Sequence, residues 1–578
     1  MFKFIRRALG LIFSTIGFAV VVILIIGYMK FVRSAQEDPD SDPMTDNSVL
    51  QLEVGGLPIK DFNLPTSLLS QLQKYRTQSL IELVELVNEA RTDSRVKAIS
   101  LSIVGNTLSA AQAEELRTAL EEFRKAGKKI YAFAYAFGDN SNGTSSYYLA
   151  SVADKIYMQP HGAVSIIGAS LESFFLKDFL DEFDITVQAA RRNEQKGVID
   201  RFTRTDFTPE VKENLYSVIS SILSHIQDAS AKGRGLDKET YVTLMNTAPH
   251  QDRQAIQTKL LDDLIYRDQV RDKIKVELGN NVAFVTEKGY SPQGKRPQSK
   301  NKIGVILLEA EVPPSGSTAL TMNDPYAPES LDKSFEMALK DPAVKAIVFR
   351  VNTPGGAVSG AETIYRAVKR TVDKGVPVII SMGSVAASAG YYMAAPATKI
   401  YANAMTLTGS IGIAMAKPNI GKATENYGIT WDRVQIGDNA GMWSMTQDFN
   451  EAAWKKVQES LDIFYANFTQ TVAEGRKLSV DNVKSIAGGQ VWSGLQAKEN
   501  GLVDEIGGFF AAMDEAKKIA NVADTEDPNI VIFNRVNVGL PLLFSLLGEE
   551  SIAIIKQAIG INTELSHTTA TTRVRLVM

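Results

Sequence analysis

The sequence predicts an α/β protein made of two tandem copies of one fold, preceded by an N-terminal transmembrane helix. The first sign is an internal repeat, in which SSYYLASVADKIY around Tyr147 aligns with AGYYMAAPATKIY around Tyr391, 244 residues later. The second is that strand-like and helix-like segments alternate within each copy. The third is the length of 578 residues, because single cores stop growing at about 250 to 300 residues.

The chain opens with an apolar segment, residues 9–29, that carries no charge over 21 positions. At about 1.5 Å per residue, such a helix spans a hydrocarbon core of about 30 Å. Lys3, Arg6 and Arg7 precede it, which favours a cytoplasmic N-terminus and a body on the opposite side. The alternative is a cleaved signal peptide, because small residues follow in VRSAQ. The apolar run exceeds the usual h-region of about 7 to 15 residues, so we expect an uncleaved anchor.

The expected domain order follows from the composition of the connecting segments. Residues 1–45 hold the anchor and a polar, proline-punctuated linker, and the first repeat covers residues 46–288. A Gly/Pro/Lys-rich connector, 289–301, leads to the second repeat, 302–525. The tail, 526–578, has apolar segments too short to span a membrane, so we expect it to pack on the body or contact another subunit. A peripheral membrane contact is the alternative.

Within each copy, strands and helices are expected in the same order. Both copies open with an apolar segment typical of a buried strand, VLQLEV near Val49 and KIGVILLEAEV near Lys302. An amphipathic stretch and a second apolar segment follow, VKAISLSI at Val96 and VKAIVFRV at Val344. Another helix, which ends in glycine, leads to a third strand. This alternation indicates parallel strands joined by right-handed crossovers.

Composition excludes several kinds of site. The chain has no cysteine, which excludes disulfides, thiolate catalysis and cysteine-ligated metals. Its net charge is −4 without a long basic block, so we expect no nucleic-acid partner. A zinc site is not expected either, because no spacing places two histidines on one helix face. The four are His161, His225, His250 and His567. We therefore expect neither a metal nor a cofactor.

Two motifs of small residues in the second repeat indicate where chemistry takes place. RVNTPGGAV, residues 350–358, joins an apolar strand to a helix, and its consecutive glycines allow backbone N–H groups to converge on an oxyanion. SMGSVAASAGYY surrounds Ser388 with small residues, so that an extended peptide can approach it. Each motif alone is more typical of an ordinary turn or of close helix packing. Together, in a repeat that also contains LTGSIG, they indicate a nucleophilic serine.

A nucleophilic serine needs a base, and the second repeat contains no histidine. At the repeat offset, Ser388 corresponds to Thr144, whereas Lys196 in RRNEQKGVID corresponds to Ala440. On composition alone, Lys196 is typical of a solvated loop. A lysine acts as a base if burial lowers its pKa by roughly three units from about 10.4. A serine without a lysine in one copy, and the reverse in the other, suggests one dyad divided between two domains.

These motifs, with their spacing and the duplication, resemble the long, two-repeat form of signal peptide peptidase A, also called protease IV. The resemblance implies a crotonase/Clp-protease-like fold. It also implies the site residues: Ser388 as nucleophile, Lys196 as base, Gly355 or Gly356 as oxyanion donor, and Ser410 as the partner of the lysine amine.

The lysine assignment has further support in the sequence. RRNEQKGVIDRFTRTDFTP aligns with the family segment that carries the lysine, through its downstream phenylalanine, arginine and Thr-Pro. Short, single-domain members carry their lysine after the serine instead, and here that segment, IGDNAGMWSMTQDF, contains no lysine. Two positions depart from the family pattern. Ala389 stands where glycine is usual, and Glu194 would keep Lys196 protonated if its carboxylate came within about 4 to 6 Å.

The resemblance implies a membrane-anchored serine endopeptidase that degrades cleaved signal peptides and other apolar peptides through an acyl-enzyme. It implies a homotetramer in the bacterial inner (cytoplasmic) membrane, with a single-pass anchor and a periplasmic catalytic body. One alternative is a crotonase-type acyl-CoA hydratase or isomerase, which needs a carboxylate at the site and cytoplasmic CoA. Another is a non-catalytic envelope scaffold, favoured only if the surroundings of Lys196 do not suit a base.

Overall fold

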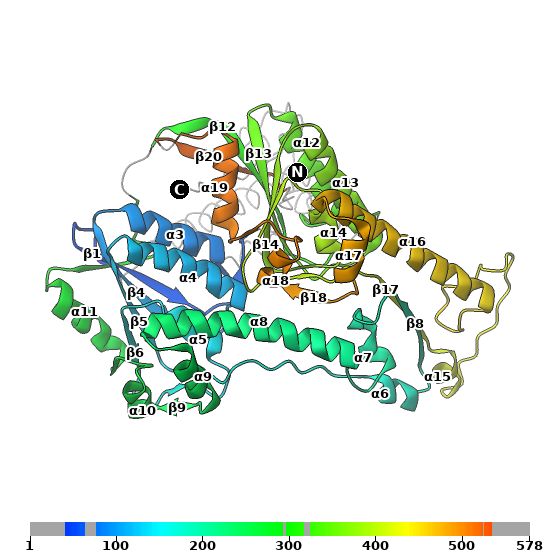
Figure 1. Ribbon diagram of the computed structural model, residues 1–578, viewed down its shortest axis with the longest axis horizontal. Helices are drawn as coiled ribbons and strands as arrows, with labels where there is room; N and C mark the ends of the chain where they lie inside the picture. Colours follow the sequence, from blue (N-terminus) through cyan, green and yellow to red (C-terminus); the bar gives the residue numbers. More distant parts are fainter. Residues whose placement is uncertain (1–40, 64–76, 293–295, 317–323, 524, 535–578) are drawn as a thin grey trace, which may run out of the picture.

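The computed structural model describes residues 41–63, 77–292, 296–316, 324–523 and 525–534 (Figure 1). The expected membrane span, residues 9–29, lies outside them, as does most of the tail. Within the described ranges, no helix combines the length and the apolar character that crossing a membrane requires.

The first repeat is built on a six-stranded sheet with the order β10-β6-β5-β4-β1-β11. All of its strand pairs are parallel, which explains the continuous apolar runs, because a parallel sheet is buried on both faces. Its strands are β1 (Ser48–Val54), β4 (Val96–Ile103), β5 (Lys129–Ala134), β6 (Lys155–Met158), β10 (Asp263–Leu264) and β11 (Ala283–Thr286).

The second repeat has an eight-stranded sheet with the order β18-β16-β14-β13-β12-β20, in which β15 pairs with β14 and β19. Its pairs are parallel except for β16 with β18. The strands are β12 (Gln298–Leu308), β13 (Val344–Thr353), β14 (Val378–Ala387), β15 (Lys399–Ala402), β16 (Leu407–Gly409), β18 (Val491–Ser493), β19 (Glu505–Ile506) and β20 (Asp527–Ile532).

The two sheets repeat each other in detail. The register shift between Ser48 and Val49 in the β1–β4 pair recurs between Lys302 and Ile303 in the β12–β13 pair. The repeated tyrosines also make the same contact: the hydroxyl of Tyr147 donates to the Leu260 carbonyl, and that of Tyr391 to the Leu502 carbonyl, each at 2.8 Å. The predicted duplicated α/β class is therefore confirmed.

Helices cover both faces of each sheet. Four of them, α3 (Leu80–Thr92), α4 (Ala110–Lys125), α12 (Pro328–Lys340) and α13 (Val358–Asp373), pack in pairs on one face. The opposite face carries α11 (Val270–Leu278) or α19 (Phe509–Ile519). In α13, small and apolar residues recur every three or four positions and form the buried stripe of an amphipathic helix.

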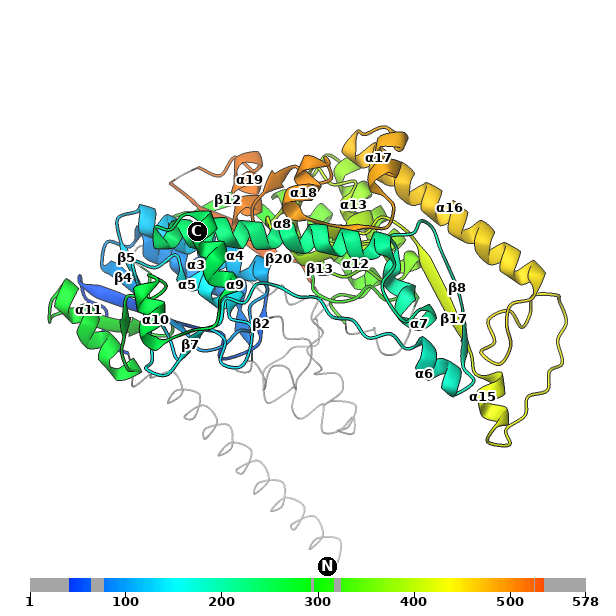
Figure 2. The same ribbon diagram turned by 60° about the horizontal axis from the view of Figure 1, so that its bottom comes forward.

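Each repeat also contains one 26-residue helix, α8 (Pro209–Arg234) in the first and α16 (Glu451–Arg476) in the second. In both views α8 lies along the molecule from the second repeat to the first (Figures 1 and 2). It starts with Thr208 as N-cap and proline in the first turn, and it ends at Gly235 in the left-handed conformation. Near its start, the side chain of Asn214 exchanges two hydrogen bonds with the backbone of Val491, at 2.8 and 3.0 Å.

A two-stranded ribbon links the repeats a second time. β8 (Thr186–Arg191) of the first repeat pairs antiparallel with β17 (Ala414–Asn419) of the second. Shorter elements complete the described fold: α5 (Thr144–Ala150), α6 (Lys177–Glu182), α7 (Asp200–Thr203), α9 (Lys238–Asn246), α10 (Asp252–Gln257), α14 (Ala389–Ala394), α15 (Gly421–Glu425), α17 (Val480–Ile486), α18 (Gly494–Glu499), β2 (Ile59–Lys60), β3 (Gln78–Ser79), β7 (Ala163–Val164), β9 (His250–Gln251), and the 3₁₀ helices η2 (Gly197–Ile199) and η3 (Arg267–Gln269).

The second sheet reaches past both boundaries expected for its repeat. β12 begins at Gln298, inside the expected connector, and β20 lies after residue 525, in the expected tail. β20 pairs with β12 at the edge of the sheet, and Val531 and Phe533 join the core of the second repeat. A short edge strand of this kind is set by a long-range pairing, which no local periodicity reveals.

Candidate active site

Ser388 lies between the end of β14 and the start of α14 and is half-buried. Its backbone angles, φ 54° and ψ −117°, are unusual for a residue with a side chain. The Ser388 N–H donates to the Gly409 carbonyl at 2.9 Å, which fixes this turn against β16. A sharp strand-to-helix turn presents a serine hydroxyl at the carboxyl end of a strand, where a nucleophile can be reached.

The PGG turn after β13 lies against this serine. Gly355 and Gly356 have φ values of 123° and 146°, which side chains rarely adopt. A Cβ atom on Gly355 would lie 2.8 Å from the Cβ of Ser388, and one on Gly356 would lie 2.1 Å from the Val312 carbonyl oxygen. Gly355 is therefore required for the close approach of this backbone to Ser388, and Gly356 for its close approach to Val312.

The two predicted oxyanion donors differ in their hydrogen bonding. The N–H of Gly355 donates to Thr353 Oγ1 at 3.2 Å and so stabilises the turn itself. Gly356 faces Val312 in an isolated β-bridge. The two hydrogen bonds of this bridge are donated by the N–H groups of Val312 and Ala357, so the Gly356 N–H takes no part in it. The N–H of Ala389, the first residue of α14, has no acceptor within its helix. In the sequence, Ala389 stands out only as a departure from the family pattern, because a backbone donor leaves no trace in residue type.

Lys196 follows β8 and precedes η2, and the β8–β17 ribbon brings it into the second repeat. Its Nζ lies 3.2 Å from Ser388 Oγ, 2.7 Å from the Ser410 carbonyl oxygen and 2.8 Å from Ser410 Oγ. The structure thus brings together the three side chains that were predicted to act together. If the amine is neutral and its two hydrogens go to Ser410, its lone pair faces the Ser388 hydroxyl.

Burial sets the charge state of this lysine. Only 6% of Lys196 is exposed, and burial lowers its pKa from 10.5 to about 8. A low-dielectric environment disfavours the charged amine, so that a useful fraction is neutral near physiological pH. The Glu194 carboxylate points elsewhere: it pairs with Arg191 at 2.9 Å, and 74% of its side chain is exposed. Burial therefore sets the lysine's pKa, although glutamate is nearby in sequence.

The histidines of the described ranges make other contacts. Nδ1 of His161 lies 3.6 Å from Asp252, and His225 faces Glu114 at 3.7 Å. Nε2 of His250 lies 2.7 Å from the Leu244 carbonyl. These groups belong to the first repeat or its seam with the second, so the Ser388 hydroxyl has Lys196 as its basic partner in the described part of the chain.

Comparisons with known proteins agree with this duplicated arrangement. A family model described as "Peptidase family S49" matches residues 122–281 and 370–523, one segment in each repeat. "Protease 4" of Haemophilus influenzae is 30% identical over 491 residues, which cover 80% of this chain and 77% of that protein. "Serine protease SPPA, chloroplastic" of Arabidopsis thaliana is 26% identical over 85% of this chain and 73% of its own. A "Putative signal peptide peptidase SppA" of Enterococcus faecium is 31% identical over 39% of this chain and 66% of its own.

Proposed function

Because this chain belongs to peptidase family S49 and is a serine peptidase, we propose that Ser388 is its nucleophile and Lys196 its general base. The observation that carries this proposal is the 3.2 Å separation of Lys196 Nζ from Ser388 Oγ, across the boundary between the repeats. The first repeat would supply the base and the second the nucleophile. Family membership also supports the Clp-protease-like α/β class for each repeat.

The proposed reaction proceeds through an acyl-enzyme. Ser388 Oγ attacks the scissile carbonyl carbon while its proton passes to Lys196 Nζ, and the N–H groups of Gly356 and Ala389 stabilise the oxyanion. Lys196 then gives this proton to the leaving amine as the C–N bond breaks. Water adds to the acyl-enzyme with Lys196 again as base, and the proton returns to Ser388 as the acid product leaves. Ser410 holds the amine in place through both of its oxygens.

We propose that the substrates are cleaved signal peptides and similar apolar peptides. The printed name of the Enterococcus relative supports this class. Large apolar side chains are also exposed on the segment before β8 and on the loop after β17, which flank the ribbon that leads to Lys196. They include Leu171, Phe174, Phe179, Phe183, Trp431, Val434, Ile436 and Trp443. Exposed apolar surface of this extent is typical of a binding region.

A crotonase-type hydratase is less well supported by the contacts of the site. That chemistry needs a carboxylate near the reacting atoms. In the described residues, Lys196 and Ser388 contact each other and Ser410, and Glu194 is turned toward Arg191.

A fluorophosphonate label on the full chain in detergent tests the serine peptidase: labelling and cleavage of an apolar peptide should both be lost in Ser388→Ala. Retained cleavage by folded Ser388→Ala would rule out this nucleophile.

We further propose a single-pass anchor at residues 9–29 in the bacterial inner membrane, with the catalytic body on the periplasmic side. The charge-free run and the basic residues before it support this topology. A periplasmic site would meet signal peptides after their release from exported proteins.

We also propose a homotetramer, closed through head-to-tail contacts. Support comes from a difference between equivalent faces of the two repeats. In the second repeat, the face beneath α19 is covered by Phe62 and Ile81 of the first repeat. On the same face, buried Arg350 pairs with Asp61 at 2.8 Å and with Glu115 at 2.7 Å. The first repeat thus seals this face of the second.

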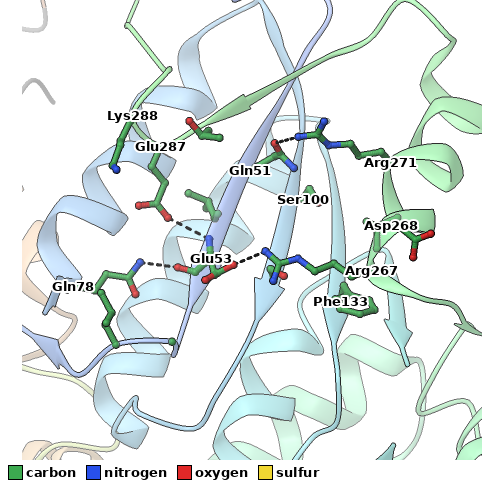
Figure 3. Close-up of a pocket in the computed structure, with 16 residues that line it drawn as sticks. Gln51, Glu53, Gln78, Ser100, Phe133, Arg267, Asp268, Arg271, Glu287 and Lys288 are labelled. Carbon is green, nitrogen blue, oxygen red and sulfur yellow. Dashed lines mark hydrogen bonds and ion pairs between the residues drawn. The ribbon is translucent and has the colours of Figure 1, made fainter. Parts of the chain in front are cut away.

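On the first repeat, the part of the equivalent face beside α11 forms an open pocket of about 700 Å³ (Figure 3). At three equivalent strand positions the pocket is polar and the sealed face apolar: by the register of the strands, Gln51, Glu53 and Ser100 occupy the places of Val305, Leu307 and Val348. Arg267, Arg271 and Lys288 also line it. A second copy would reach this face with the edge of its second repeat, where Glu329 stands in the place that Ile81 takes in the first.

A head-to-tail contact of this kind joins two different surfaces and closes into a ring when the rotation allows it. The polar lining suits a contact between separate chains better than one within a chain. Arg271→Glu and Glu329→Arg should each reduce assembly, and the double variant should restore it, as native mass spectrometry in detergent would measure. Unchanged assembly in both single variants would rule out this face.

A further inference from the structure

The loop 487–490, between α17 and β18 of the second repeat, lies against the loop that carries Lys196. The N–H of Gln195 donates to the Gly488 carbonyl at 3.1 Å, and Asn193 Nδ2 donates to the Ala487 carbonyl at 3.2 Å. The backbone on either side of the proposed base is therefore fixed by a segment that follows it by almost 300 residues.

Gly489 makes the closest approach to the lysine. A Cβ atom on Gly489 would lie 2.6 Å from the Lys196 nitrogen, 2.8 Å from its Cα and 2.7 Å from its Cβ. Separations below 3.0 Å are not tolerated between such atoms, and two of the three belong to the backbone, which cannot rotate away. Gly489 also has a φ of 90°, which favours glycine. The main chain of the second repeat is thus in direct contact with the main chain of the base.

The same loop holds the partner of the base. The N–H of Ser410 donates to the Gln490 carbonyl at 2.8 Å, and both oxygens of Ser410 accept from Lys196 Nζ. One three-residue segment, 488–490, therefore contacts both the backbone around Lys196 and Ser410, which accepts hydrogen bonds from the lysine amine. A shift of this segment would change the position of Nζ relative to Ser388.

We propose that residues 488–490, with Gly489 at the centre, are a positioning element that places the Lys196 amine against Ser388 when the two repeats pack together. This inference rests on the proposed Ser–Lys dyad. The hydrogen bonds of this segment go to Gln195 and Ser410, whereas Ser388 Oγ contacts Lys196, so we expect its effect to pass through the lysine. Its disruption should lower kcat and leave KM for a peptide nearly unchanged.

Gly489→Ala is the direct test, carried out on the full chain in detergent with an apolar peptide substrate. The added methyl group must push the lysine loop outward, and a misplacement of about 1 Å costs about 100-fold in rate. Gly412→Ala gives an intermediate case, because its Cβ would lie 3.2 Å from the Gly489 Cα and 3.3 Å from Lys196 Cδ, two tight contacts that a shift of a few tenths of an ångström relieves. We expect a loss of about 100-fold for Gly489→Ala and a smaller loss for Gly412→Ala.

Gly375→Ala is the matched control. Gly375 has a φ of 81°, close to that of Gly489, but a Cβ there would meet nothing within 4 Å. It measures the effect of backbone strain alone, and we expect it to keep wild-type kcat. If Gly489→Ala does not fold, as judged by its melting transition, the comparison of Gly412→Ala with Gly375→Ala decides the matter.

A pH profile distinguishes positioning from general damage. Charged groups around the lysine loop are paired among themselves: Arg191 with Glu194 and Asp200, and Arg192 with Asp462. Loosening the loop should therefore expose Lys196 to water and raise its pKa, so that the rise of kcat with pH moves to higher pH. Wild-type kcat and an unmoved profile in both Gly489→Ala and Gly412→Ala would overturn the inference. An inactive wild type would instead overturn the proposed function.

Discussion

Lys196 Nζ lies 3.2 Å from Ser388 Oγ, although 192 residues separate them in the chain. Each comes from a different repeat, and β8 and β17 hold the two repeats together beside the pair. Because the two groups would act as one unit, Ser388→Ala and Lys196→Ala should be equally severe. The double variant should be little worse than either single variant. Steady-state hydrolysis of an apolar peptide checks this, and a double variant far below both singles would contradict the dyad.

Arginine should not replace the lysine. The guanidinium of Lys196→Arg cannot lose a proton near neutral pH, so we expect activity no higher than that of Lys196→Ala. Peptide hydrolysis and fluorophosphonate labelling should fall together. Near-wild-type rates for Lys196→Arg would show that the base is another group.

Activity should rise with pH through one ionisation. In the proposed mechanism the neutral amine is the active form, and burial lowers the pKa of Lys196 to about 8. The kcat/KM of the wild type should therefore increase tenfold per pH unit well below pH 8 and level off above it. The profile should be the same with and without EDTA. A bell with an acidic limb near pH 6 would point to histidine instead.

The same burial should make the lysine costly for stability. Its folded pKa of about 8 lies below the ordinary 10.5, so between these values the unfolded chain binds more protons and stability rises with pH. Below pH 8 the charged amine costs about 3 kcal/mol, at about 1.4 kcal/mol per pKa unit. Lys196→Met should thus be inactive but more stable than wild type at pH 6, and the difference should shrink between pH 8 and 10.5. Thermal melts measure it, and a less stable Lys196→Met at pH 6 would contradict the expected sign.

The buried ion cluster at the seam should be essential for stability. Arg350 is 2% exposed and bonds Asp61 and Glu115, and its removal leaves two buried carboxylates without their cation. Arg350→Met should destabilise the chain by about 3 to 5 kcal/mol. Arg124→Met is a suitable control, because its pair with Asp154 is partly exposed and such pairs contribute about 0 to 1 kcal/mol. Denaturant unfolding of both variants tests the difference, and equal midpoints would be the contrary result.

The proposed topology predicts that the body is exposed outside the cytoplasmic membrane. In spheroplasts of a bacterial host, added protease should digest residues after about 35, and the intact protein should stay in the membrane fraction. Protection of the whole body would reverse the orientation. A soluble mature form would indicate cleavage of the N-terminal segment.

The duplicated fold and the two candidate catalytic side chains were predictable from the sequence because both leave marks in residue type. Tyr147 and Tyr391 mark the repeat, and Ser388 and Lys196 each lack a counterpart in the other copy. The backbone donors and the positioning element, residues 488–490, were not predictable. Gly489 resembles any loop glycine until the fold places Lys196 beside it, since its contact crosses the interface between the repeats.

The buried ion cluster between the two repeats was not predictable for a similar reason. In the sequence, Arg350 is marked only as the first residue of the RVNTPGGAV motif, and its partners Asp61 and Glu115 lie more than 200 residues earlier. Local patterns report periodicity and turn chemistry, whereas pairings between distant charges depend on how whole domains meet.

The pairing of β8 with β17 has a consequence for the newly made chain. Synthesis runs from the N-terminus, so the ribosome completes the lysine-bearing strand long before the strand and the serine that complement it. A half-made polypeptide would therefore hold the proposed base without the serine that it is proposed to activate. Hydrolytic power would arise only after the second half has been translated and docked, so that the order of synthesis itself would delay peptidase activity.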